Sequence, residues 1–207
     1  AWYQDLNFDF LGLALPISKN ITLGINATYL SYGEIEGYDA DDNPTGNVDG
    51  TSDLAGAIYA GFQFTENISA GVGAKYIALT LAGRKSNAVV ADFGLKYRSG
   101  PLTLGLSAAN FGQKIKFNQV EENLPSLVRV GAALTPFGNS LLVSLDFEKQ
   151  LHGDLMLHNG YELNFGERYF IRTGYYYSPD AEGVSLTNSF SFGVGALLGP
   201  AQFDYTF

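Results

Sequence analysis

The sequence contains no cysteine, two histidines and no long run of apolar residues. The absence of cysteine excludes a disulfide framework and a thiolate metal site. A membrane-spanning helix needs about 20 consecutive apolar residues, and the longest runs here, such as Leu11 to Ile17, are far shorter. The sequence therefore predicts that no helix of this chain crosses a membrane.

Charged residues are few and mostly acidic. They make up 16% of the chain, against roughly 25% in a typical soluble domain, and the formal net charge is −9. A negative charge argues against a nucleic-acid partner, because phosphates attract basic surfaces. With only His152 and His158 present, there is little basis for a Ser/His catalytic triad or a histidine-rich metal site. We therefore expect no enzyme activity, no cofactor and no resident metal ion.

Glycine and aromatic residues are abundant, with 25 glycines, 13 tyrosines and 15 phenylalanines. Hydrophobic residues make up 46% of the chain, yet the mean hydropathy is only +0.02. Apolar and polar residues must therefore be finely mixed. From Leu102 to Ala109, for example, an apolar residue at every second position alternates with threonine, glycine, serine or alanine. This period is typical of strands whose two faces meet different surroundings.

About twelve such strands can be recognised, and most have about the 9–11 residues that cross a bilayer at a steep tilt. Strands of soluble proteins are usually nearer 5–6 residues, so the length favours a membrane barrel. The predicted strands are Trp2–Leu15, Ile21–Gly33, Ser52–Phe64, Ile68–Leu81, Ala88–Arg98, Leu102–Gly112, Leu124–Thr135, Leu141–Gln150, Leu155–Asn164, Tyr169–Tyr177, Leu186–Leu198 and Ala201–Phe207.

The connections between these strands alternate between short and long. The short ones are Pro16–Asn20, Thr65–Asn67, Ser99–Pro101, Pro136–Asn139, Phe165–Arg168 and Gly199–Pro200. The longer ones are Glu34–Thr51, Ala82–Asn87, Gln113–Asn123, Leu151–Asp154 and Ser178–Ser185. Outer-membrane barrels have short periplasmic turns and longer outer loops. The alternation therefore favours an outer-membrane barrel over a soluble sandwich.

The same alternation predicts something about the ends of the chain. If the short turns are periplasmic, the first strand starts outside and the last ends outside, whereas single-chain bacterial barrels normally keep both termini in the periplasm. The start, Ala1 to Tyr3, also lacks the basic and apolar regions of a signal peptide. We therefore expect at least one strand to be missing at each end.

The predicted fold class is all-β, an antiparallel transmembrane β-barrel with about 12 strands visible of about 14. Residues 1–207 are expected to form a single barrel domain that is incomplete at both ends. Such a protein lies in the bacterial outer membrane, and its first partner is the lipid bilayer.

Short motifs occur in a definite order along nearly the whole chain. They are Tyr32–Asp39, Asn43–Gly46, Ala74–Ile77, Ala91–Gly94, Ser107–Gly112, Leu124–Pro125, Arg129–Gly131, Asp146, Gly160–Glu162 and Arg172–Tyr175. In this order they resemble the PorV/PorQ-like branch of the FadL-type outer-membrane barrels. The opening Asn-Pro-Ala-Gly-like segment of that family and its last strand are absent here, which agrees with the prediction about the ends.

The resemblance implies one of two functions. A PorV/PorQ-like barrel would be an accessory or docking component of a secretion or surface-attachment apparatus, with other envelope proteins as partners. A FadL-like barrel would instead be a channel or binder for hydrophobic small molecules. The resemblance is closer on the PorV/PorQ side, so the accessory role is the first expectation and the channel is the alternative.

Charged side chains fall on the inward face of four consecutive predicted strands, by alternation. An Arg or Lys facing lipid near the midplane would cost roughly 2–4 kcal/mol, so these side chains should face the lumen or a rim. They form either an ion-pair network that fixes the strand register or a polar ligand site on a permeation path. The residues are Arg129, Asp146, Glu148, His158, Glu162 and Arg172.

The predicted loop Glu34–Asp53 carries seven acidic residues and no basic residue. Its Asp39, Asp41 and Asn43 resemble the start of a calcium loop, in which alternate residues bind the ion. However, Pro44 stands where that loop needs its glycine, and Gly50 where it needs its glutamate. We therefore expect a solvated outer loop without a metal site.

Overall fold

The computed structural model describes residues 6–33, 35–38, 41–48, 51–81, 83–117, 120–179, 189–199 and 201–206. Within these residues the chain is almost entirely strand, with one short 3-10 helix, η1 (Gly138–Ser140). In this part of the chain, no helix has the length and apolar character needed to cross a membrane.

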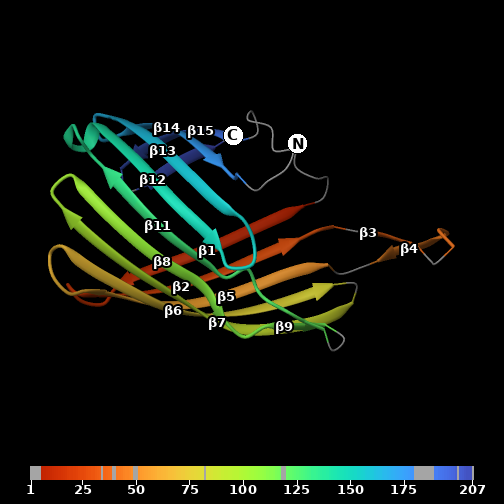
Figure 1. The fold of residues 1–207 in the computed structure, drawn as a ribbon. Coiled ribbons are helices and arrows are strands. Elements are labelled where there is room, and N and C mark those ends of the chain that lie inside the picture. Colours follow the sequence, from red (N-terminus) through yellow and green to blue (C-terminus); the bar gives the residue numbers. More distant parts are fainter. Residues whose placement is uncertain are drawn as a thin grey trace. The chain divides into compact units, whose positions relative to one another are not determined.

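Twelve strands of the described residues form one antiparallel sheet, and each strand pairs with its neighbours in chain order. This confirms the predicted all-β fold (Figure 1). The strands are β1 (Asn7–Pro16), β2 (Ile21–Ser31), β5 (Ser52–Gln63), β6 (Ile68–Leu81), β7 (Arg84–Ser99), β8 (Leu102–Gly112), β11 (Leu127–Leu134), β12 (Leu141–Gln150), β13 (Leu155–Phe165), β14 (Tyr169–Tyr177), β15 (Phe190–Leu198) and β16 (Ala201–Thr206).

Two of the predicted loops contain short hairpins. In the loop after β2, β3 (Ile35–Tyr38) pairs with β4 (Pro44–Val48). In the connection after β8, β9 (Ile115–Phe117) pairs with β10 (Val120–Glu122). Strands of three to five residues are too short to show a clear alternation, so the sequence did not reveal them.

The prediction of a longer connection at Ala82–Asn87 is wrong, because β7 already begins at Arg84. The hydroxyl of Ser86 is buried and accepts a hydrogen bond of 2.8 Å from the backbone N–H of Lys116. This contact holds the start of β7 against a distant segment, which local sequence cannot indicate. The end residues Ala1 and Phe207 lie outside the described residues, so the missing end strands stay a prediction.

Contacts between residues divide the chain into two compact units. Unit 1 combines Ala1–Gln63, Gly71–Phe93 and Ala109–Leu124. Unit 2 combines Phe64–Ala70, Gly94–Ala108 and Pro125–Phe207.

In each unit, one face of the strands carries large apolar side chains that remain exposed. Ile58 in unit 1 is 65% exposed, and Phe147 in unit 2 is 51% exposed. Among the described residues no large side chain is fully buried. A water-soluble domain would cover such side chains, whereas a barrel turns them toward the acyl chains of the bilayer. We call this face the outer face, and the opposite face of the same strands the inner face.

The inner face of unit 1 has a small apolar cluster of its own. Ile115 and Leu124, from the connection after β8, are buried against Ala88 and Val90 of β7. The side chain of Gln113 fixes the start of this connection, since its Oε1 accepts a 3.0 Å hydrogen bond from the N–H of Val89. We call residues 113–117 and 120–124 the covering segment, because they lie over the inner face of β7.

Candidate functional site

All six charged residues singled out in the sequence lie on the inner face of unit 2, on four neighbouring strands. Directly opposite residues of an antiparallel pair have Cβ atoms about 5 Å apart, close enough for their side chains to interact. The opposite pairs are Arg129 with Glu148, Asp146 with His158, and Glu162 with Arg172.

The first pair is centred on Glu148, whose side chain is only 7% exposed. Arg129 donates two hydrogen bonds to its Oε2, one of them from Nε at 2.9 Å. The Nε2 of His158 lies 4.0 Å from the same oxygen. A buried carboxylate is stable only when it is paired and hydrogen-bonded, and Arg129 supplies both. The charge of the Glu148 carboxylate is therefore balanced by Arg129.

Asp146 differs from the other acidic residues of the set, because it forms no ion pair with any described residue. Its carboxylate lies over Gly131 of the neighbouring strand, in space that a Cβ atom at that position would occupy. The opposite residue, His158, lies instead beside the ring of Tyr176, with 6.3 Å between the ring centroids. The structure thus leaves one negative charge of the set unpaired.

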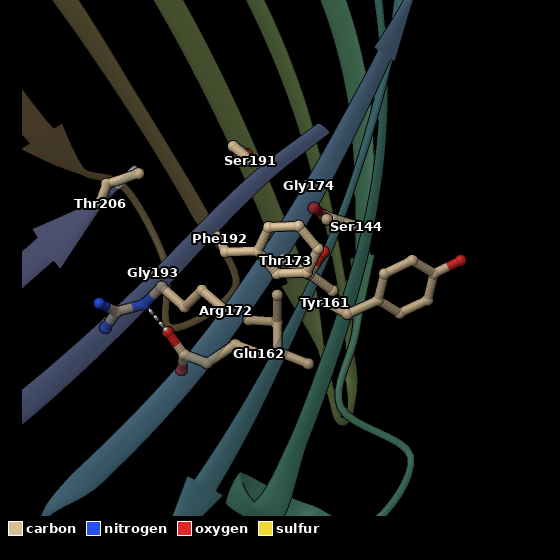
Figure 2. A pocket seen from close by; sticks show the side chains of 12 residues that line it. Ser144, Tyr161, Glu162, Arg172, Thr173, Gly174, Ser191, Phe192, Gly193 and Thr206 are labelled. Carbon is tan, nitrogen blue, oxygen red and sulfur yellow. Dashed lines mark hydrogen bonds and ion pairs between the residues drawn. The ribbon is translucent and has the colours of Figure 1, made fainter. Parts of the chain in front are cut away.

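Arg172 binds two carboxylates from different strands. Its Nε donates to Glu162 at 2.6 Å, and its Nη1 donates to Asp204. Figure 2 shows Arg172 and Glu162 pointing toward each other, while Tyr161 points away. The guanidinium group also lies 5.1 Å from the ring centroid of Phe170, within cation–π range.

Sequence reasoning missed Asp204. Arg172 on β14 reaches Asp204 on β16 across the intervening β15, where Gly195 leaves room for both side chains. Asp204 alternates with the exposed Phe203 and Tyr205 of β16, which is the signal for an inner-face position, but its partner lies two strands away. A pairing rule restricted to adjacent strands could not find this contact.

A groove of about 300 Å³ lies next to Arg172 and is lined by residues of unit 2. Its floor crosses four strands at Ser144, Gly160, Gly174 and Ser191, which are in register with one another. These residues have short side chains or none, so the inner face is hollowed between the charged rows (Figure 2). The groove can hold a ligand against the sheet, with Glu162 and Arg172 at its border.

Unit 1 contains a polar cluster that the sequence did not reveal. Lys75 forms a 2.9 Å ion pair with Asp92 and donates a 2.8 Å hydrogen bond to the side-chain oxygen of Asn110. Asp92 also accepts hydrogen bonds from the backbone N–H of Asn110 at 2.8 Å and from the hydroxyl of Tyr59 at 3.0 Å. The side chains of Lys75 and Asp92 are only 19% and 16% exposed. We call Tyr59, Lys75, Asp92 and Asn110 the Lys75 cluster.

Two backbone features assemble the Lys75 cluster. Asn110 has a φ of 62°, in the left-handed region that interrupts strand alternation and re-aims a side chain. Gly73 leaves the space over which the ring of Tyr59 lies on its way to Asp92. Simple alternation would have placed Asn110 on the outer face, so the sequence could not predict its part in the cluster. Lys75 and Asp92 lie on adjacent strands, and alternation on the inner face is the signal that could have paired them.

Tyr32, which directly follows β2, donates a 2.9 Å hydrogen bond to Asp53, the second residue of β5. Partial burial, this hydrogen bond and the negative charge of Asp53 all raise the pKa of Tyr32. The phenol therefore stays protonated at neutral pH and keeps the contact between the ends of β2 and β5.

The described residues contain no group of three or more His, Cys, Asp or Glu side chains arranged to hold a metal ion. Of the sequence that resembles a calcium loop, Asp39 and Gly50 lie outside the described residues. The arrangement that is present offers charge pairing, hydroxyl groups and a groove. It is suited to binding and guiding a molecule.

Comparison with solved structures identifies barrels of the same fold. The toluene transporter TbuX of Ralstonia pickettii matches with a TM-score of 0.65 at 12% identity, over 95% of this chain and 74% of that one. A Pseudomonas aeruginosa FadL homologue matches with a TM-score of 0.60 at 10% identity, over 97% of this chain and 68% of that one. Outer membrane phospholipase A from Escherichia coli has a TM-score of 0.50 at 12% identity, over 91% of this chain and 77% of that one.

These similarities establish the fold, which is that of bacterial outer-membrane β-barrels and places the chain in that membrane, as the sequence predicts. Two of these neighbours are FadL-type barrels. No protein-family model matches the sequence. No curated protein matches it in sequence either.

Proposed function

We propose that this protein is a FadL-like outer-membrane channel or binder that admits hydrophobic small molecules. The observation that carries the proposal is the similarity in fold to a toluene transporter and a FadL homologue over nearly the whole chain. The groove beside Arg172 is consistent with it, because a passing molecule can rest there against the inner face. In this proposal residues 1–207 belong to one barrel domain, and the six charged residues of unit 2 line its inner surface.

The PorV/PorQ-like accessory role is the less supported reading. It rests on short motifs in a shared order, such as Arg172–Tyr175, and the comparisons give no support for a partner in a secretion apparatus. Fold alone does not choose between the two roles. Both neighbours of higher similarity favour the channel.

A catalytic role is not part of the proposal, although one barrel of similar fold is a phospholipase. A serine hydrolase needs a histidine within hydrogen-bond reach of its serine. In the described residues His158 lies near Glu148 and Tyr176, and its Nε2 has no hydrogen-bond partner. The surroundings of His158 therefore give no support for a Ser/His catalytic pair at this residue.

The proposal can be tested by uptake in Gram-negative cells that lack their own transporter for hydrophobic compounds. Cells that express the barrel should take up a radiolabelled aromatic hydrocarbon faster than cells with an empty vector. An equal rate in both, together with stoichiometric co-purification of another envelope protein, would favour the accessory role instead. The folded state of the barrel is checked in the same cells by its shift in gel mobility on heating.

A further inference from the structure

We infer that the barrel admits uncharged hydrophobic molecules and discriminates against hydrophobic carboxylates, because the inner-face cations away from the rim are already neutralised by carboxylates of the chain. This inference rests on the proposed transport function and names its substrate class.

In unit 2 the two described arginines of the inner face that lie away from the strand ends, Arg129 and Arg172, are both paired with carboxylates. Arg129 is bound to Glu148, and Arg172 is bound to both Glu162 and Asp204. Asp146 adds a carboxylate that has no ion-pair partner among the described residues, as noted above. Among the described residues away from the strand ends, four carboxylates therefore stand against two guanidinium groups on this face. A surface with an excess of one charge repels ligands of the same sign.

In unit 1 Lys75 is an inner-face cation away from the strand ends, and its ammonium group is bound to Asp92 and to the oxygen of Asn110. Asp92 is held in turn by Tyr59 and by the backbone of Asn110. A carboxylate ligand would have to displace a carboxylate that three other groups hold in place. The Lys75 cluster therefore presents a neutral surface to a passing molecule.

The energetic consequence differs between the two classes of ligand. A carboxylate that leaves water needs a cation or several hydrogen-bond donors in exchange, and it is unstable without them. An uncharged hydrocarbon needs only a dry or weakly wetted surface. The groove supplies such a surface in part, since Leu142 also lines it and its glycines add no polar side chain.

Three further cations lie on the inner-face side of β7, Arg84, Lys96 and Arg98, and all are exposed. Arg84 is the first residue of the strand, and Lys96 and Arg98 fall within its last four residues, next to the turn at residues 100–101. Charges near the end of a membrane strand are hydrated and add little to ligand binding. The inference therefore concerns the surface between the strand ends.

The first test compares two probes of matched size in the expressing cells, naphthalene as the uncharged hydrocarbon and decanoate as the carboxylate. We expect naphthalene uptake above the empty-vector rate, and decanoate uptake lower by about tenfold or more, the scale of one unfavourable charge contact. Decanoate uptake equal to or faster than that of naphthalene would overturn the inference and leave the transport function intact. If neither probe enters faster than in empty-vector cells, the proposed function itself fails.

The second test frees a cation. The double variant Glu162→Gln with Asp204→Asn leaves Arg172 without its partners and should raise decanoate uptake about tenfold. Adding Arg172→Gln to this variant is the matched control, and it should abolish the gain. Asp92→Asn frees Lys75 in unit 1 and provides an independent variant if the first does not fold. Unchanged decanoate uptake in the folded variants would contradict the charge explanation.

Discussion

Two glycines on the inner face of β6 differ only in what lies above them. A Cβ atom at Gly73 would overlap the ring of Tyr59, whereas a Cβ atom at Gly71 would only meet a backbone oxygen at 3.6 Å, an ordinary contact. The ring of Tyr59 carries the hydroxyl that binds Asp92. The Lys75 cluster therefore requires that position 73 has no side chain, so that this ring can lie there.

We expect Gly73→Ala to lower the free energy of unfolding by about 1–3 kcal/mol, because the displaced ring strains its surroundings and loses its hydrogen bond. The matched control, Gly71→Ala, should change it by less than about 0.5 kcal/mol. Urea titration of the barrel in lipid vesicles measures both. Equal effects at the two positions would show that the ring of Tyr59 is free to move.

The two inner-face aspartates Asp92 and Asp146 make a second comparison at this scale. Asp92 has a cation and two hydrogen-bond donors around it, while Asp146 has no ion-pair partner among the described residues, as noted above. We expect Asp92→Asn to cost about 2 kcal/mol of stability, because it removes a charge-assisted contact and leaves Lys75 unpaired. Asp146→Asn should cost less than about 0.5 kcal/mol. Urea unfolding in vesicles measures the free energy of unfolding of both variants. A larger loss for Asp146→Asn than for Asp92→Asn would contradict the ion pairing described for the two aspartates.

At the scale of elements, the covering segment shows why part of the inner face could not be predicted. The strands of the sheet follow from alternation, because each strand has a lipid face and an inner face along its whole length. The covering segment has no such period, and its position depends on Ile115 meeting Ala88 and on Ser86 meeting Lys116. Such contacts join residues that are far apart in the sequence, so only the structure reveals them.

We expect Ile115→Ala to loosen the covering segment and to speed trypsin cleavage at Lys114 and Lys116 by about tenfold, because local opening becomes easier when buried apolar contacts are lost. The control is Val89→Ala, on the outer face of the same strand that the segment covers, where the side chain is 49% exposed. This variant should leave the cleavage rate unchanged. Timed digestion of the barrel in vesicles gives the rates, and an equal rate in wild type and Ile115→Ala would mean that the segment is not held by this contact.

At the scale of the whole molecule, the sequence was sufficient for the order of the strands in the large sheet and only partly for the candidate site. The strand positions and the two faces could be predicted because lipid imposes the same rule at every second residue. The pairs Arg129 with Glu148 and Glu162 with Arg172 lie on adjacent strands, so alternation was enough to bring them together. The Lys75–Asp92 pair also lies on adjacent strands and was open to the same rule, whereas the place of Asn110 in the Lys75 cluster was not predictable, because it depends on the left-handed φ of Asn110.

The assignment of the outer face to lipid can be tested with one pair of neighbouring residues in the middle of β12. Leu145 lies on the outer face and is 41% exposed, while Ser144 lies on the floor of the groove on the inner face. Leu145→Arg places a charge among acyl chains and should lower the free energy of unfolding by about 2–4 kcal/mol. Ser144→Arg places the same charge beside water and acidic residues, so its effect should stay below about 1 kcal/mol. Both are measured by urea unfolding in vesicles, where a reversed order would mean that the apolar rows face a protein interior and that the membrane assignment must be abandoned.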